Sequence, residues 1–225
     1  MKKIGMIVAV EIEAVLNKFG MPIQELKFAG HVVYQYKLAE QELFVIHSGA
    51  GEIAAAMATQ FLISQFNIDL IVNFGVVGGL THEMALARTC IVESVVHYDF
   101  DTSEADGSEV GRYLDYPSVY IPTTKEILHK ALEIEPTLRK VVCASGDKFI
   151  AQKEKKEELH NIYKADICEM EAAGIVLTCN KNKIPCLLIK TVSDSITGGA
   201  SEFWNAVNES ARICLEITSK ILNNF

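Results

Sequence analysis

Short apolar segments alternate with segments of helical period along most of the chain, and this alternation limits the fold more than any other feature. Strands are expected at residues 4–10, 31–37, 42–47, 69–74, 90–96, 140–144 and 184–190. Helices are expected within residues 48–66 and at 125–132, 153–163, 169–180 and 202–223. Strands that are apolar on both faces and alternate with helices predict an α/β sandwich around a mixed or parallel sheet.

The chain shows no linker, internal repeat or shift in composition. Its 225 residues are enough to bury a large core without disulfides or a metal. We therefore expect a single domain over residues 1–225. An acidic, glycine-bearing segment at 99–112 predicts a long loop, and such loops in compact domains are often functional.

Charge and composition exclude several classes of function. The 21 Lys and Arg residues against 29 Asp and Glu residues give a net charge of −8, which disfavours nucleic-acid binding. The run at 153–158 alternates lysines with glutamates and predicts a solvated helix face. No apolar run reaches the roughly 20 residues of a membrane helix, and Glu11 and Glu13 interrupt the apolar start, which argues against a secretory signal. We expect a cytoplasmic protein.

The six cysteines are scattered, mostly among apolar neighbours, and form no CxxC pair. No cysteine or histidine spacing matches a zinc site. No GxGxxG or GxxxxGK[ST] motif predicts a dinucleotide or triphosphate site. The sequence therefore predicts reduced cysteines, no metal and no cofactor.

Small or acidic residues follow several of the predicted strands. These segments are residues 11–13, 48–51, 75–79, 145–150 and 193–194. Ligands of α/β proteins bind at the carboxyl ends of strands, although each segment taken alone is also compatible with a tight turn.

Three carboxylates stand out at these positions: Glu13, Glu171 and Asp194. Glu169 and Glu171 fall at a predicted helix start, where negative charge is also favourable for purely structural reasons. A carboxylate such as Asp194 after a strand is often just a helix N-cap. The three together, with no metal motif to use them, favour acid–base chemistry.

Six segments in order carry a family resemblance: KIGMIVAVEIEA, SGAGEIAAA, NFGVVGGL, SGDKFI, CEMEAAGIV and VSDS. Across nearly its whole length the chain resembles the 5′-methylthioadenosine/S-adenosylhomocysteine nucleosidases of the purine nucleoside phosphorylase superfamily. The resemblance implies a three-layer sandwich with a mixed central β-sheet flanked by helices. It also implies hydrolysis of the N-glycosidic bond of such nucleosides, to adenine and the 5-thioribose, within methionine salvage.

The resemblance assigns roles to individual residues. Asp194 corresponds to the general acid that protonates purine N7, and Glu13 to the residue that activates water. Glu171 corresponds to the carboxylate that binds the ribose hydroxyls, with Met170 against the sugar. The remaining substrate-binding residues are expected at Phe149, Ile150, Glu169, Ser193, Val76, Gly78, Lys190 and Phe203, with Trp204 as the alternative to Phe203.

Three positions depart from the family pattern. Val76 replaces a hydroxyl residue, Lys190 replaces an arginine, and Phe74 replaces a smaller polar residue. The first two bear on the water beside the general base, since lysine lacks the planar fork of arginine. Three alternatives therefore stay open: a purine nucleoside phosphorylase, a nucleosidase for another purine nucleoside such as a futalosine, and a non-catalytic nucleoside-binding homologue.

The expected partner is a small purine nucleoside, with no nucleic acid and no membrane. The resemblance also implies a homodimer. The apolar helix at residues 53–66 is a candidate interface element, and plain core packing explains its pattern equally well.

Overall fold

The strands at 2–8, 70–79 and 186–194 bury nearly all of their side chains on both faces, because apolar residues occupy successive positions along them. The outer strand at 24–28 is largely exposed. The computed structural model describes residues 2–28, 30–38 and 40–225. The strands are β1 (Lys2–Val8), β2 (Gln24–Phe28), β3 (His31–Leu38), β4 (Gln41–His47), β5 (Leu70–Gly79), β6 (Thr89–His97), β7 (Ile121–Pro122), β8 (Arg139–Ser145), β9 (Ile167–Glu169) and β10 (Cys186–Asp194). The helices are α1 (Ile12–Phe19), α2 (Glu52–Phe66), α3 (Ser103–Asp106), α4 (Lys125–Ile134), α5 (Lys153–Tyr163), α6 (Ala172–Asn182) and α7 (Ala200–Leu222).

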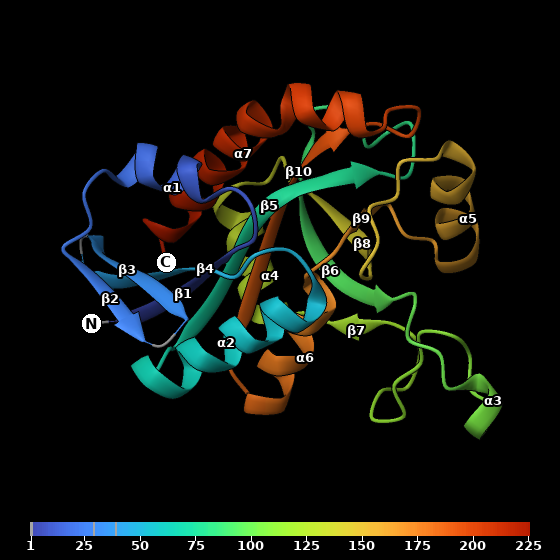
Figure 1. Ribbon diagram of the computed structural model, residues 1–225, viewed down its shortest axis with the longest axis horizontal. Coiled ribbons are helices and arrows are strands. Elements are labelled where there is room, and N and C mark those ends of the chain that lie inside the picture. The colour runs from blue at the N-terminus through green and yellow to red at the C-terminus, as the bar shows by residue number, and fades with distance from the viewer. Residues whose placement is uncertain (1, 29, 39) are drawn as a thin grey trace.

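Helices cover the two faces of one mixed sheet, as the sequence predicts. Ile71 of β5 belongs to a core shared with α2 and α6. Its neighbours Leu70 and Val72 point to the opposite face, into a second core shared with α1, α4 and α7. Side chains alternate across a strand, so the sheet is the middle of three layers, with α7 and α1 on one side and α2 and α6 on the other (Figure 1).

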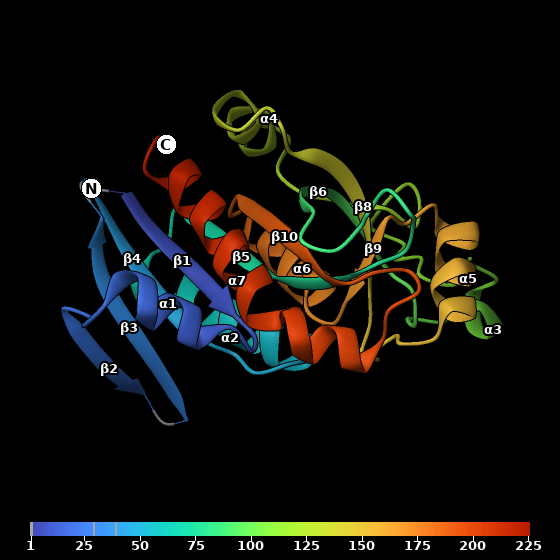
Figure 2. The same ribbon diagram turned by 90° about the horizontal axis from the view of Figure 1, so that it is seen from above.

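The order of the strands brings distant segments of the chain to one edge. β1 lies between β4 and β5, and β10 lies beside β5, all in parallel. β10 also pairs with β6, β6 with β8, β8 with β9, and β9 returns to β5, so half of the sheet closes on itself. Figure 2 shows α7 crossing above this region, with α5 at the end of the molecule opposite the two termini.

Several boundaries differ from those expected. β5 continues through Gly79 and β10 through Asp194, because both extend into the closed half of the sheet. Glu169 ends strand β9, and α6 begins only at Ala172, so the predicted helix start at 169 is wrong. The strands β2, β7 and β9 were not expected, and the predicted loop at 99–112 contains the single-turn helix α3. In the part of the chain that the structure describes, no helix is both long and apolar enough to cross a membrane.

Candidate active site

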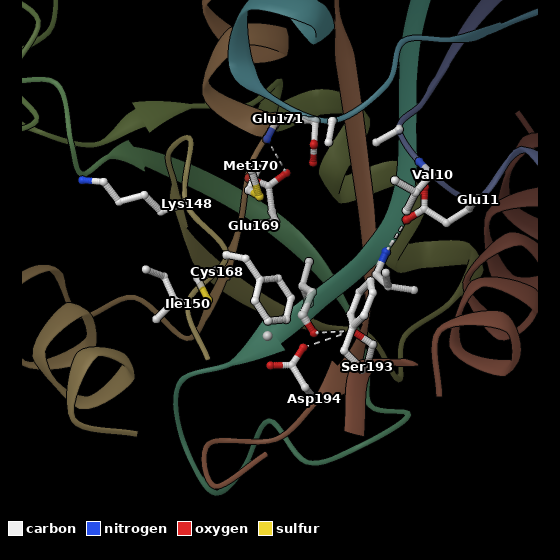
Figure 3. A pocket seen from close by; sticks show the side chains of 17 residues that line it. Val10, Glu11, Lys148, Ile150, Cys168, Glu169, Met170, Glu171, Ser193 and Asp194 are labelled. Carbon is white, nitrogen blue, oxygen red and sulfur yellow. Dashed lines mark hydrogen bonds between the residues drawn. The ribbon is translucent and has the colours of Figure 1, made fainter. Parts of the chain in front are cut away.

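A cavity of about 190 Å³ opens where β1, β5 and β10 end (Figure 3). The β9–α6 junction, the loop after β8 and the start of α7 complete its wall. The lining residues are Ala9, Val10, Glu11, Ala50, Val76, Val77, Gly78, Lys148, Phe149, Ile150, Cys168, Glu169, Met170, Glu171, Ser193, Asp194 and Phe203. Of the predicted site residues, Glu13, Lys190 and the alternative candidate Trp204 do not line it.

The carboxylate after β1 that faces the cavity is Glu11, not the predicted Glu13. Glu11 is 6% exposed; its Oε1 accepts a hydrogen bond from the Val76 N–H at 2.8 Å, and its Oε2 accepts one from the Val10 N–H at 3.0 Å. Glu13 is exposed and lines a neighbouring hollow between α1 and α7, which shares Val10 and Glu11 with the cavity wall. Residues two apart at the start of a helix point about 200° apart. The orientation of α1 therefore brings only one of the two glutamates into the cavity.

Gly75 allows Glu11 and Lys190 to approach β5 closely. A Cβ at this position would lie 2.9 Å from Oε1 of Glu11 and 3.6 Å from Nζ of Lys190. At position 76 it is the backbone N–H of Val76 that orients Glu11.

Lys190 lies beneath the cavity rather than in its wall. Its Nζ donates to Oε2 of Glu169 at 2.9 Å, and both side chains are buried. Burial disfavours the ammonium, but the charges of Glu169 and Glu171 outweigh it and raise the pKa of Lys190. Burial likewise opposes ionisation of Glu169, yet Lys190 and hydrogen bonds lower the pKa of this carboxyl. Both groups therefore stay ionised, and the resulting ion pair lies directly beneath the cavity.

Glu171 presents a carboxyl of unusually high proton affinity to the cavity. Its Oε1 accepts a hydrogen bond from the Gly51 N–H at 2.9 Å, which ties the β9–α6 junction to the start of α2. Burial, followed by the charge of Glu169, raises the pKa of Glu171 to about 7. The side chain can therefore donate or accept a hydrogen bond near neutral pH.

Asp194, at the end of β10, is paired with a lysine that the sequence analysis missed. Nζ of Lys156 lies 2.5 Å from Oδ2 of Asp194, and Ser193 Oγ donates to Oδ1 at 3.2 Å. Burial raises the pKa of Asp194, although the hydrogen bond and charge of Lys156 act in the opposite direction.

The prediction of a solvated face at 153–158 is wrong for one of its lysines. Lys156 is fully buried, together with Leu159 and Tyr163 on the same face of α5. This i, i+3, i+7 spacing was visible in the sequence and could have identified Lys156 as an inward-facing residue.

A second buried network, also missed, supports the acidic wall. The hydroxyl of Ser145 contacts Oε1 of Glu52 and lies 2.6 Å from Oε1 of Glu169. A hydroxyl has one proton to donate, so one of these two carboxyls must be protonated. Burial and the nearby charge of Glu169 raise the pKa of Glu52 to about 8, which identifies Glu52 as the protonated partner.

The opposite wall of the cavity is aromatic and apolar. Phe149 and Phe203 meet edge to face with ring centroids 5.3 Å apart, and Ile150 and Met170 lie beside them. Trp204 contacts Phe203 but is 73% exposed and does not line the cavity, so Phe203 is the one of the two candidates at the wall. Such a surface suits a planar aromatic ligand.

The arrangement fits proton transfer to and from a planar, polar ligand. Figure 3 shows Glu11 and Asp194 on different sides of the cavity, with Glu171 at a third position. Buried carboxylates stabilise a developing positive charge more strongly than exposed ones, because the local dielectric is low. Among residues 2–28, 30–38 and 40–225, no group of three or more His, Cys, Asp or Glu side chains is arranged to hold a metal ion.

Comparisons with known proteins agree with this geometry. The profile of a family described as the phosphorylase superfamily matches residues 3–225. An aminodeoxyfutalosine nucleosidase of Helicobacter pylori is 28% identical over 93% of each chain. A 5′-methylthioadenosine/S-adenosylhomocysteine nucleosidase of Shewanella loihica is 33% identical over 86% of each chain. The structure of a Helicobacter pylori MTAN mutant with 5′-methylthioadenosine in its active site covers 100% of both chains, with a TM-score of 0.93 and 25% identity.

Proposed function

The chain belongs to the phosphorylase superfamily, and on that premise we propose that it hydrolyses 5′-substituted adenosines of the 5′-methylthioadenosine/S-adenosylhomocysteine type. It is an N-glycosyl hydrolase whose substrate is a small nucleoside. Water adds to C1′ of the sugar, the bond to the base breaks, and adenine leaves. The observation that carries the proposal is that Glu11, Glu171 and Asp194, from three distant segments, line one cavity with an aromatic wall.

Asp194 is the proposed general acid. Its proton passes to N7 of the purine, so that adenine leaves as a neutral molecule while the carboxylate of Asp194 is regenerated. Asp194 is buried, and burial raises its pKa, which favours the protonated form that a general acid needs. Phe149 and Ile150 form the surface on which the base stacks.

Glu11 takes the role of water activation that the sequence analysis gave to Glu13. Two backbone N–H groups fix its carboxylate in the cavity wall. Breaking the glycosidic bond gives the sugar an oxocarbenium character, which Glu11 and Glu171 stabilise electrostatically. Glu171 and Met170, which line the cavity, are assigned to contact the ribose hydroxyls and the sugar ring.

Hydrolysis is favoured over phosphorolysis by the charges around the cavity. Within the described chain, the lining residues include four carboxyls and one cation, Lys148. A phosphate ion would meet repulsion from the carboxylates, and phosphate sites normally call on arginine.

The decisive experiment is incubation with 5′-methylthioadenosine in phosphate-free buffer, with detection of free adenine. Adenine release without phosphate supports the hydrolase. Release only after phosphate is added would identify a phosphorylase, with an arginine supplied by a partner subunit as one source of the anion site. Calorimetric binding without turnover in either buffer would identify a non-catalytic binding protein.

The substituent at the 5′ position is the finer part of the proposal. The two kinds of nucleosidase to which the chain is similar are named for different 5′-substituted adenosines. Competition between 5′-methylthioadenosine, S-adenosylhomocysteine and aminodeoxyfutalosine, read as kcat/KM ratios, ranks the substituents. A place in methionine salvage is proposed on the same resemblance, and a cytoplasmic location on the composition of the sequence.

We also propose that the protein is a homodimer that pairs through α2. Ile53 and Met57 lie one turn apart on this helix and are 74% and 57% exposed. Exposed apolar side chains at i, i+4 spacing form a surface that a second copy can cover. Sedimentation equilibrium tests this: wild type should be dimeric, and the double variant I53E/M57E should be monomeric. A monomeric wild type would contradict the proposal.

A further inference from the structure

Lys156 is a fully buried cation next to the proposed acid. Its Nζ lies 2.5 Å from Oδ2 of Asp194, 2.7 Å from the carbonyl oxygen of Ser195 and 3.2 Å from that of Gly198. The backbone carbonyl oxygen of Asp194 lies at 3.5 Å, so the three N–H bonds of the ammonium are shared among four acceptors. One side chain from α5 thus holds the carboxyl of Asp194 and both ends of the 195–198 segment that leads into α7.

Stability alone is a poor reason for this pair. A buried ion pair contributes little compared with apolar side chains of the same volume, because both charges lose their hydration. Lys156 lies among apolar neighbours on α5, where a leucine or methionine would pack with Leu159 and Tyr163. The contacts of its Nζ are all directed to Asp194 and the segment after it.

We propose that Lys156 is a positioning residue that orients Asp194 and makes it a stronger acid when its proton passes to the leaving base. The inference rests on the proposed function. As the proton moves from Asp194 to N7, negative charge develops on a carboxyl that lies beside a fixed ammonium. That interaction is stronger in the transition state than in the ground state, which is the condition for catalysis. Lys156 holds Oδ2, whereas the partner of Oδ1 is the Ser193 hydroxyl, which can also donate to the Val77 carbonyl oxygen 3.3 Å away. We therefore assign the exchange of the proton to Oδ1.

The groups that face Asp194 act in two directions. Lys156 from α5 favours the carboxylate, while Glu202 from α7 and burial favour the protonated acid. Glu202 also accepts a hydrogen bond from the Ser195 N–H at 2.6 Å, so the 195–198 segment is held by α7 as well as by Lys156 of α5. Cys168 from β9 stays a neutral thiol, because burial raises its pKa to about 12. Removing the ammonium should therefore leave Asp194 a weaker acid.

The test compares two leaving groups in the intact enzyme. K156M should reduce kcat on 5′-methylthioadenosine by about 10²-fold, the lower range for loss of acid catalysis. It should change the hydrolysis of 4-nitrophenyl 5-methylthioriboside by less than about 3-fold, because nitrophenolate leaves without a proton. The alkaline limb of the kcat/KM profile for 5′-methylthioadenosine should move up by roughly 1 to 3 pH units, and K156R should restore the wild-type limb.

Two further variants separate positioning from folding. K155M changes the neighbouring lysine, whose partner Glu158 is on the surface, and should leave both substrates unaffected. Adding K156M to D194N should cost no further activity on 5′-methylthioadenosine if Lys156 acts through Asp194.

If K156M lost kcat equally on both substrates, or if the alkaline limb of its kcat/KM profile did not move, the inference would be overturned while the proposed function stayed intact. A wild-type enzyme that releases no adenine would overturn both.

Discussion

Exchanging Glu11 and Glu13 in turn tests the most specific consequence of the fold. E11Q should lower kcat on 5′-methylthioadenosine by about 10²–10⁴-fold, the usual range for a general base. That range equals about 3–5 kcal/mol of transition-state stabilisation, at 1.36 kcal/mol per tenfold change. E13Q, two residues away and exposed, should keep wild-type kinetics.

The hydrogen bonds of Glu11 also predict an effect on stability. Both carboxylate oxygens accept from backbone N–H groups, of Val10 and Val76. A glutamine has one accepting oxygen, so its amide NH₂ must face one of these donors. Leaving a buried donor unpaired costs about 1–3 kcal/mol, whereas an exposed substitution changes stability by less than about 0.5 kcal/mol.

Steady-state kinetics with 5′-methylthioadenosine, followed by adenine release, and thermal unfolding of both variants provide the assay. E11Q should lose turnover and melt at a lower temperature, while E13Q should do neither. An inactive E13Q beside an active E11Q would show that α1 is rotated in the working enzyme and would refute this assignment.

Three other perturbations follow from single contacts. D194N should lose at least about 10²-fold in kcat on 5′-methylthioadenosine while still binding it, measured by calorimetry. G75A places a Cβ 2.9 Å from Oε1 of Glu11, so kcat should fall about 10-fold with little change in KM. Unchanged kinetics would show that the carboxylate of Glu11 can shift away from the new methyl group without loss of activity. The pKa of Glu52 is raised from 4.5 to about 8 in the folded protein, so the folded state binds more protons than the unfolded chain between these values and stability falls as pH rises through them. E52Q should flatten this dependence of stability on pH, because its amide can donate to Ser145 and accept from the Gly174 N–H as the protonated acid does. Thermal melts from pH 5 to 9 test this, and an unchanged slope in E52Q would contradict it.

Most of the architecture could be predicted from local patterns. The apolar segments and helical periods predicted the main strands and helices, because an element that buries one or both faces needs apolar residues at regular positions in the sequence. The short strands β7 and β9 were missed, because they owe their strand geometry to pairing with partners far along the chain. β2 was missed because it is mostly polar and exposed, although it pairs with the adjacent β3.

The candidate site was predicted as a set of strand ends but not in its detail. Asp194, Glu171, Met170 and Phe149 were named from the sequence, and the structure places them around one cavity. Glu13 was assigned as the water-activating residue from the family resemblance, and only the rotation of α1 in the structure shows that Glu11 is the one that faces the cavity.

What the sequence determined by itself is therefore the type and order of the elements, and the presence of carboxyls at their ends. Tertiary structure alone decided which charged side chains are buried and which partners they meet. Lys156 and Lys155 are adjacent and chemically identical, yet one is sealed against Asp194 and the other pairs with Glu158 at the surface. The difference arises because α5 packs through one face only, and the direction of that face is set by contacts with residues more than 30 positions away.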